Sequence, residues 1–107
     1  MPHRYLLNSP LLTDYGEWRL EGPLDLAAAK AFIAQGAESA IGHLGAAQLM
    51  EAELGLPVAV SRHAIRMAPG DQALILRLRE RLAEGVVLDR SSASAIAHEY
   101  AMLTRLL

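Results

Sequence analysis

The segment Gln72–Arg79 constrains the fold more than any other part of the chain. Its sequence, QALILRLR, alternates with a period of two, and successive side chains of a β-strand point to opposite faces of a sheet. One face would carry Leu74, Leu76 and Leu78, and the other Ala73, Ile75, Arg77 and Arg79. The pattern therefore predicts a strand over Gln72–Arg79, and a strand needs a partner.

The stretch just before this strand offers a candidate partner. Ser61–Met67 alternates in the same way, and it places Arg62 and Arg66 on one side. Ala68–Asp71, with the sequence APGD, is typical of a turn. Two strands that flank a short turn predict a β-hairpin. Shorter extended stretches are predicted at Arg4–Asn8, Glu17–Leu20 and Val86–Leu88.

Three other segments have the period of a helix. They are Pro23–Gln35, Gly42–Leu54 and a final stretch that begins at Ser91 or Ser92 and runs to Leu107. Their apolar stripes are Leu26, Ala29 and Ile33; Ala46, Leu49, Met50 and Leu54; and Ile96, Tyr100, Leu103 and Leu107. Strands mixed with helices predict an α/β fold, with a small mixed sheet flanked by helices.

Length and composition narrow the class of protein. A chain of 107 residues fits one domain, 1–107, and 52% apolar residues exclude a disordered chain. The chain has no cysteine, so a disulfide scaffold, a thiol nucleophile and a cysteine-ligated metal are excluded. No apolar run approaches the roughly 18 residues of a membrane span. The cytoplasm is therefore the expected compartment.

Several polar residues could carry chemistry, and each also has an ordinary structural explanation. His43 lies at a predicted helix start, where unpaired N–H groups attract an anion, but it could simply cap the helix. Arg77 and Arg81 share strand parity and could form a phosphate-binding ridge with Arg62, or a solvated face. Glu84 could orient a reacting group or only pair with an arginine on the surface.

Other kinds of site find little support. His3, His63 and His98 have no metal-ligand spacing with each other or with His43. The chain also lacks a His-Glu-x-x-His motif, a Gly-rich phosphate loop and a Gly-x-Ser-x-Gly elbow. We therefore expect no metal and no cofactor. Lys30 is the single lysine among 10 basic residues, and the formal net charge is −2, which disfavours a long nucleic acid as partner.

Three segments together resemble a known family. They are YLLNS at 5–9, SAIGH at 39–43 and RLAEGVVL at 81–88. In this order and spacing they are similar to the viral anti-CRISPR ring nucleases and to their cellular relatives, the Crn-type ring nucleases of type III CRISPR systems. The resemblance spans almost the whole chain, and SAIGH is its most specific part.

The resemblance implies a function and a set of site residues. Family members are metal-independent phosphodiesterases that bind cyclic tetra-adenylate and cleave it to linear di-adenylate, as homodimers with the ring at the two-fold interface. It implies that His43 is the general acid, assisted by Arg81 and Glu84. Substrate contacts are implied for Asn8, Ser9, Ser39, Ile41, Gly42, Arg62 and Arg77.

Other functions remain open from the sequence. The chain could be a non-catalytic module that sequesters cyclic oligo-adenylate or binds another protein. A small transcription regulator is disfavoured, because no predicted helix carries a basic recognition face. The sequence also leaves open whether the enzyme acts for a virus, in the host cytoplasm, or for a cell that switches its own signal off.

Overall fold

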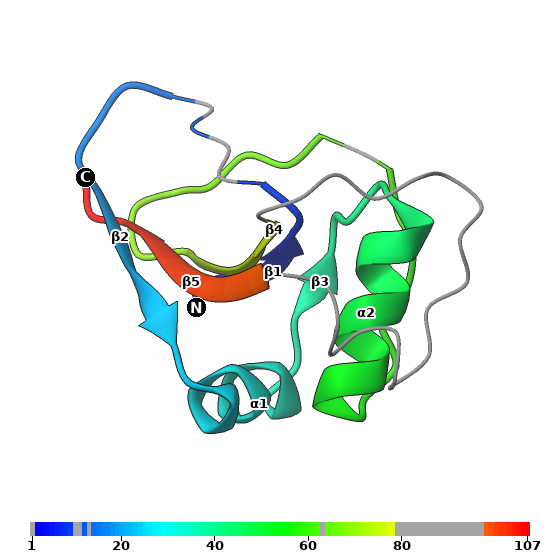
Figure 1. Cartoon of the computed structure of the whole chain (residues 1–107). Coiled ribbons are helices and arrows are strands. Elements are labelled where there is room, and N and C mark those ends of the chain that lie inside the picture. The colour runs from blue at the N-terminus through cyan, green and yellow to red at the C-terminus, as the bar shows by residue number, and fades with distance from the viewer. Residues whose placement is uncertain (1, 10–11, 13, 63, 79–97) are drawn as a thin grey trace.

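The computed structural model describes residues 2–9, 12, 14–62, 64–78 and 98–107. It contains a five-stranded sheet in the order β2-β5-β4-β1-β3 and two helices (Figure 1). The elements are β1 (Arg4–Leu7), β2 (Trp18–Leu24), α1 (Leu26–Ala34), β3 (Glu38–Ser39), α2 (Leu44–Leu54), β4 (Gln72–Leu78) and β5 (His98–Arg105). β1 pairs in parallel with β3 and β4, whereas β5 pairs antiparallel with β4 and β2. The mixed sheet confirms the predicted α/β class.

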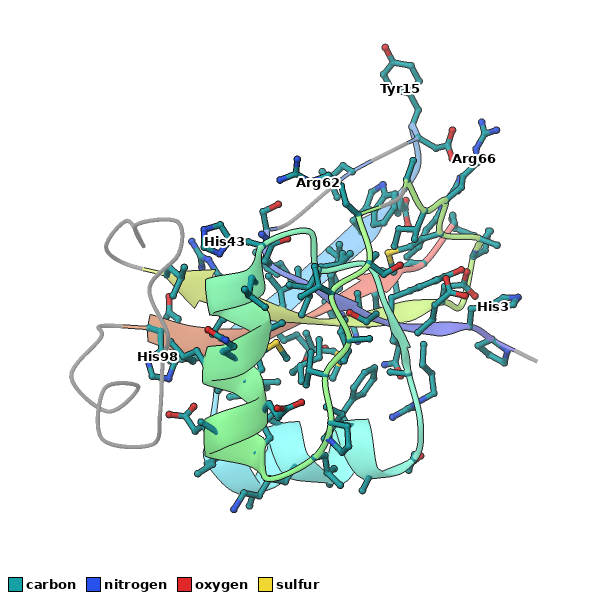
Figure 2. All side chains as sticks on the ribbon, turned by 90° about the vertical axis from the view of Figure 1, so that its right-hand side faces the viewer. His3, Tyr15, His43, Arg62, Arg66 and His98 are labelled. Carbon is teal, nitrogen blue, oxygen red and sulfur yellow. The ribbon has the colours of Figure 1, made fainter. Side chains whose placement is uncertain are left out.

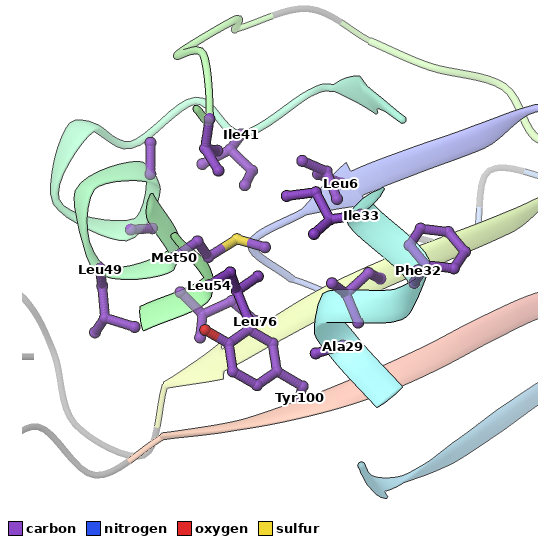
Figure 3. Packing of buried hydrophobic residues seen from close by; sticks show 14 residues of the cluster. Leu6, Ala29, Phe32, Ile33, Ile41, Leu49, Met50, Leu54, Leu76 and Tyr100 are labelled. Atoms are coloured by element: carbon purple, nitrogen blue, oxygen red, sulfur yellow. The ribbon is translucent and has the colours of Figure 1, made fainter. Parts of the chain in front are cut away.

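Both helices cover the same face of the sheet (Figure 1). Their buried side chains pack with strand residues into one apolar cluster, which includes Met50 and Leu54 of α2, Ile33 of α1 and Leu76 of β4 (Figure 3). Burial of the apolar surface of this cluster is the main contribution to stability, at roughly 25 cal/mol per Å² of apolar surface removed from water. The stripe predicted for the second helix, Ala46, Leu49, Met50 and Leu54, is fully buried.

An irregular segment covers the other face. Residues 64–71 cross the sheet on the side away from the helices (Figure 1). Ile65 and Met67 are buried there against strand side chains. These strand residues are Tyr5, Leu7, Ala73, Ile75 and Leu103. β4 is therefore buried on both faces, and its alternation follows the predicted parity.

The predicted hairpin is wrong. Described residues 61–67 form no strand, and β4 pairs with β1 and β5. The alternation of this segment reflects its role as a cover, in which Ile65 and Met67 point inward while Arg66 is exposed. Arg62 consequently does not lie on a strand beside Arg77.

The predicted final helix is also wrong where the structure describes it. Residues 98–105 form β5, whose side chains alternate between the two faces. Tyr100 packs with the helices, and Leu103 packs on the opposite face, so the two do not share a stripe. Ile96, Val86–Leu88 and Arg79 lie outside the described residues.

The other boundaries shift by a few residues. β2 extends to Leu24, so Pro23 belongs to a strand and α1 begins at Leu26. Asp25 caps α1, because its Oδ1 accepts a hydrogen bond of 2.7 Å from the N–H of Ala28. Within the described residues, neither helix is long and apolar enough to cross a membrane.

Candidate functional site

The candidate site lies where three parallel strands end. β1 sits between β3 and β4, and all three run in the same direction. The chain leaves β3 on one side of β1, passes through α2 and returns as β4 on the other side. In open α/β sheets, ligands usually bind at the carboxyl ends of the strands, at the point where successive connections lead to opposite sides of a strand.

Backbone contacts anchor the 39–43 loop at this place. The N–H of Ala40 donates to the carbonyl of Leu6 in β1 at 2.9 Å, and the hydroxyl of Ser39 donates to the carbonyl of Ala59. The N–H of Ser61 donates to the carbonyl of Ile41 at 2.9 Å. Ile41 is completely buried, so its side chain anchors the loop in the core and does not face a ligand.

His43 is the N-cap of α2. Its ring Nδ1 accepts a hydrogen bond of 3.3 Å from the N–H of Ala46, and its carbonyl accepts one of 3.1 Å from Ala47. In the neutral ring an accepting Nδ1 leaves the proton on Nε2. In the neutral ring the cap thus fixes the tautomer and makes Nε2–H the donor. The sequence predicted His43 just inside the helix, whereas in the structure it is the N-cap, one residue before the first helical residue, Leu44.

Arg62 docks on the same loop. Its Nη2 donates to the carbonyl of Gly42 at 3.3 Å, and the side chain is exposed. A Cβ atom added to Gly42 would lie 3.2 Å from Nε and 3.3 Å from Cβ and Cγ of Arg62. Glycine at this position therefore lets the arginine stem pass closely over the loop. Figure 2 shows Arg62 and His43 on the same side of the molecule.

We expect Gly42→Ala to disturb the site and spare the fold. The new methyl group must push the Arg62 stem away by a few tenths of an ångström, and small displacements of charged groups weaken ligand binding and catalysis. Affinity for an anionic ligand should fall about 10-fold, with the melting temperature nearly unchanged. Titration of the ligand and thermal denaturation measure the two effects.

A double-mutant cycle decides whether Gly42→Ala acts through the arginine. In an Arg62→Ala background the contacts with Nε and Cγ are gone and only the contact with Cβ remains, so Gly42→Ala should cost much less than it does in the wild-type protein. Additive losses in the double variant would contradict this coupling.

The remaining predicted site residues divide into two groups. Asn8 and Ser9 directly follow β1 at the same edge. Arg77 lies near the end of β4, on the face away from the helices, and its Nη1 is 3.6 Å from a carboxylate oxygen of Glu99. Its exposed guanidinium thus belongs to the same edge but already has an acidic neighbour. Arg81 and Glu84 lie outside the described residues.

A second polar cluster, which the sequence analysis did not single out, joins α2 to β5. Nε2 of His98 is 2.8 Å from both carboxylate oxygens of Glu53. Burial, followed by the nearby Glu53 carboxylate, raises the pKa of the Tyr100 hydroxyl well above its ordinary value. No group of three or more potential metal ligands occurs among the described residues. The sequence held no signal for this cluster, because its members come from distant elements.

Comparison with known proteins finds that the chain is similar to two viral proteins. B116 of Sulfolobus turreted icosahedral virus has the same fold: the TM-score is 0.79 at 21% identity, over 96% of this chain and 99% of B116. The uncharacterized protein ORF117 of Acidianus two-tailed virus is 44% identical over 50 residues, which are 47% of this chain and 43% of ORF117. The chain thus matches less than half of that relative's length.

The family match extends much further along the chain. The sequence profile described as STIV B116-like matches residues 4–100. This range includes β1 to β4, both helices and the first part of β5. This chain belongs to the STIV B116-like family.

Proposed function

We propose that the chain is a metal-independent ring nuclease, which binds cyclic tetra-adenylate and cleaves it to linear di-adenylate. The observation that carries the proposal is the position of His43. A histidine caps α2 at the carboxyl end of the central parallel strand, on the loop to which an exposed arginine docks. The resemblance of the segments 5–9, 39–43 and 81–88 to ring nucleases supplies the substrate.

The choice of capping residue supports a catalytic role. Serine, threonine, aspartate and asparagine are the preferred N-caps, because a short side-chain oxygen reaches the first free N–H groups. Histidine gives a longer cap here, at 3.3 Å, and brings a group that can transfer protons near neutral pH. Departures from local stability rules are expected at functional sites.

The proposed reaction uses a nucleophile that the RNA ring supplies. The 2′-oxygen attacks the adjacent phosphorus and its proton passes to solvent water, the bond to the 5′-oxygen breaks, and a 2′,3′-cyclic phosphate forms. His43 donates a proton to the leaving 5′-oxygen, a step worth about 10²–10⁴-fold. Arg62, with Arg81, neutralises the non-bridging oxygens. Glu84 positions the 2′-hydroxyl or holds an arginine in place.

Proton donation has a consequence for the cap. A doubly protonated ring carries hydrogen on Nδ1 and cannot accept from the N–H of Ala46. His43 would therefore leave its cap when it becomes the acidic form next to the bound phosphate. The helix start, freed of its cap, then directs unpaired N–H groups toward the anion.

The proposed assembly is a homodimer with the ring at its two-fold axis. Two copies of His43 could then cut opposite phosphates of a four-fold repeating ring and release two equal halves. The viral relatives favour the reading in which the enzyme works in the host cytoplasm and removes a signal of type III CRISPR immunity.

Incubation with radiolabelled cyclic tetra-adenylate in EDTA tests the proposal. The expected result is linear di-adenylate at the rate seen without EDTA, because no step uses a metal. Tight binding without products would instead identify a module that sequesters the ring. Absence of binding would reject both functions.

A further inference from the structure

The hydroxyl of Ser39 joins the loop that carries His43 to a segment that lies 20 residues further along the chain. It accepts a hydrogen bond of 3.4 Å from the N–H of Ile41 and donates one of 2.5 Å to the carbonyl of Ala59. A serine hydroxyl has one proton, and here the carbonyl of Ala59 receives it. No proton remains for a phosphate oxygen, so the contribution of Ser39 to the site must come from the segments that it joins.

This hydroxyl occupies the place of a backbone hydrogen bond. Residues 59–61 run alongside residues 39–41 in the same direction, because the N–H of Ser61 donates to the carbonyl of Ile41 at 2.9 Å while Ser39 contacts Ala59. In a regular parallel ladder, Ile41 would in turn donate its N–H to the carbonyl two residues before Ser61, which is that of Ala59. The Ser39 hydroxyl stands between these two groups, and this hydroxyl relay links Ile41 to Ala59.

The hydroxyl relay bears directly on Arg62. This arginine follows the relayed segment, and its Nη2 donates to the carbonyl of Gly42 at 3.3 Å, one residue before His43. The two groups that the proposed reaction brings to the phosphate thus come from segments that the relay holds side by side (Figure 2).

A second anchor holds the same segment in a different way. Oε1 of Glu51, on α2, accepts a hydrogen bond of 2.9 Å from the N–H of Val58. This contact ties the segment to the body of the helix, whereas the relay ties it to the loop that carries His43. The two anchors can therefore be removed separately.

We propose that Ser39 is a positioning residue, which sets the place of the Arg62 guanidinium relative to the His43 ring through the hydroxyl relay. The inference rests on the proposed ring cleavage and adds to it a residue that touches neither substrate nor reacting atoms. Without the hydroxyl, the N–H of Ile41 and the carbonyl of Ala59 lose their partner and must either close on each other or admit a water. Closure draws the segment toward the loop, and a water holds it without a covalent tether. Both responses displace or loosen Arg62, and small displacements of this kind slow catalysis.

Matched variants test this role by cleavage of cyclic tetra-adenylate. Ser39→Ala should slow the reaction about 10-fold, and Ser39→Thr, which keeps the hydroxyl at a half-buried strand position, should stay close to the wild-type rate. Glu51→Ala removes the other anchor but leaves the relay, so it should slow the reaction less than Ser39→Ala does. In an Arg62→Ala background, Ser39→Ala should cost no further rate, because the hydroxyl acts through the arginine.

Amide hydrogen exchange of Ser61 tests the relay without substrate. The N–H of Ser61 donates to Ile41, so loosening of the segment in Ser39→Ala should speed its exchange about 10-fold, and Ser39→Thr should restore the protection. The amides of β4 serve as the control and should exchange as in the wild-type protein, because β4 is paired with a strand on each side.

Several results would overturn the role of Ser39. They are a wild-type rate in Ser39→Ala, no recovery in Ser39→Thr, an equal loss in Glu51→Ala, and unchanged exchange of Ser61 in Ser39→Ala. Additive losses in the double variant with Arg62→Ala would also overturn it and would show that Ser39 contacts the ring directly. If the wild-type protein does not cleave the ring, the proposed function fails. If it does cleave the ring, each of these results rejects the role of Ser39 alone.

Discussion

Replacing His43 with asparagine is expected to slow cleavage of cyclic tetra-adenylate by about 10²–10⁴-fold and to leave the fold intact. Asparagine is among the best N-cap residues, and its side-chain oxygen can accept the hydrogen bond that Nδ1 now accepts from Ala46. It cannot donate a proton to the leaving 5′-oxygen. Single-turnover product formation and thermal denaturation measure the two quantities independently.

Two further variants make the result specific. His3→Asn is the same substitution at an exposed position beside the start of β1, away from the candidate site, and should change neither rate nor stability. His43→Ala removes both the acid and the cap, so it should match the rate of His43→Asn and lose about 1 kcal/mol of stability. Wild-type cleavage by His43→Asn would exclude the histidine as general acid. A large loss of stability in the same protein would show that the ring is needed for more than its cap.

Strands and helices could be predicted from the sequence where the hydrophobic periodicity fits only one type of secondary structure. The predicted bounds of β1 and α2 agree with the structure to within two residues at each end. For α2 the reason is that its apolar stripe is confined to one face. The motif SAIGH was predicted at the start of that helix, but Ser39 belongs to β3, which was not predicted, and only His43 takes part in the helix start, as its N-cap. His43 was the candidate residue at the predicted helix start, and the structure puts it at the N-cap of α2.

The two failures have different physical causes. β5 is an interior strand, so apolar residues occur on both of its sides and its alternation disappears. Tyr100 and Leu103 then also satisfy helical spacing, and periodicity alone cannot separate the two structures. In residues 61–67 the alternation is real, but it records burial under a cover and not hydrogen bonding to β4.

The docking of Arg62 could not have been predicted either. It depends on a glycine 20 positions away and on the turn that brings residue 61 to Ile41. Such contacts arise from tertiary packing, and no local pattern encodes them. The proposed roles of Arg81 and Glu84 still rest on the sequence resemblance alone.

Truncation of the two faces of β4 is the second prediction with a large effect. Leu76 is fully buried beneath the helices, and Ile75 is fully buried beneath the segment that contains Ile65 and Met67. Leu76→Ala and Ile75→Ala should each lower the free energy of unfolding by about 2–5 kcal/mol, because each leaves a cavity in a closely packed layer. Urea denaturation, with unchanged m values as the check on two-state behaviour, measures both losses.

A comparison of Ile75→Ala with Leu20→Ala, a substitution at a more exposed position on the same face, tests whether residues 64–67 cover the sheet. Leu20 of β2 pairs with Leu103 and therefore lies on the same face as Ile75, but it is 47% exposed. Leu20→Ala should thus cost well under half as much as Ile75→Ala, since a half-exposed side chain removes less surface from water and leaves no closed cavity. If Ile75→Ala costs no more than Leu20→Ala, the cover formed by residues 64–67 is open in solution. Equal and large losses for Ile75→Ala and Leu76→Ala would establish that an irregular segment protects the sheet as well as two helices do.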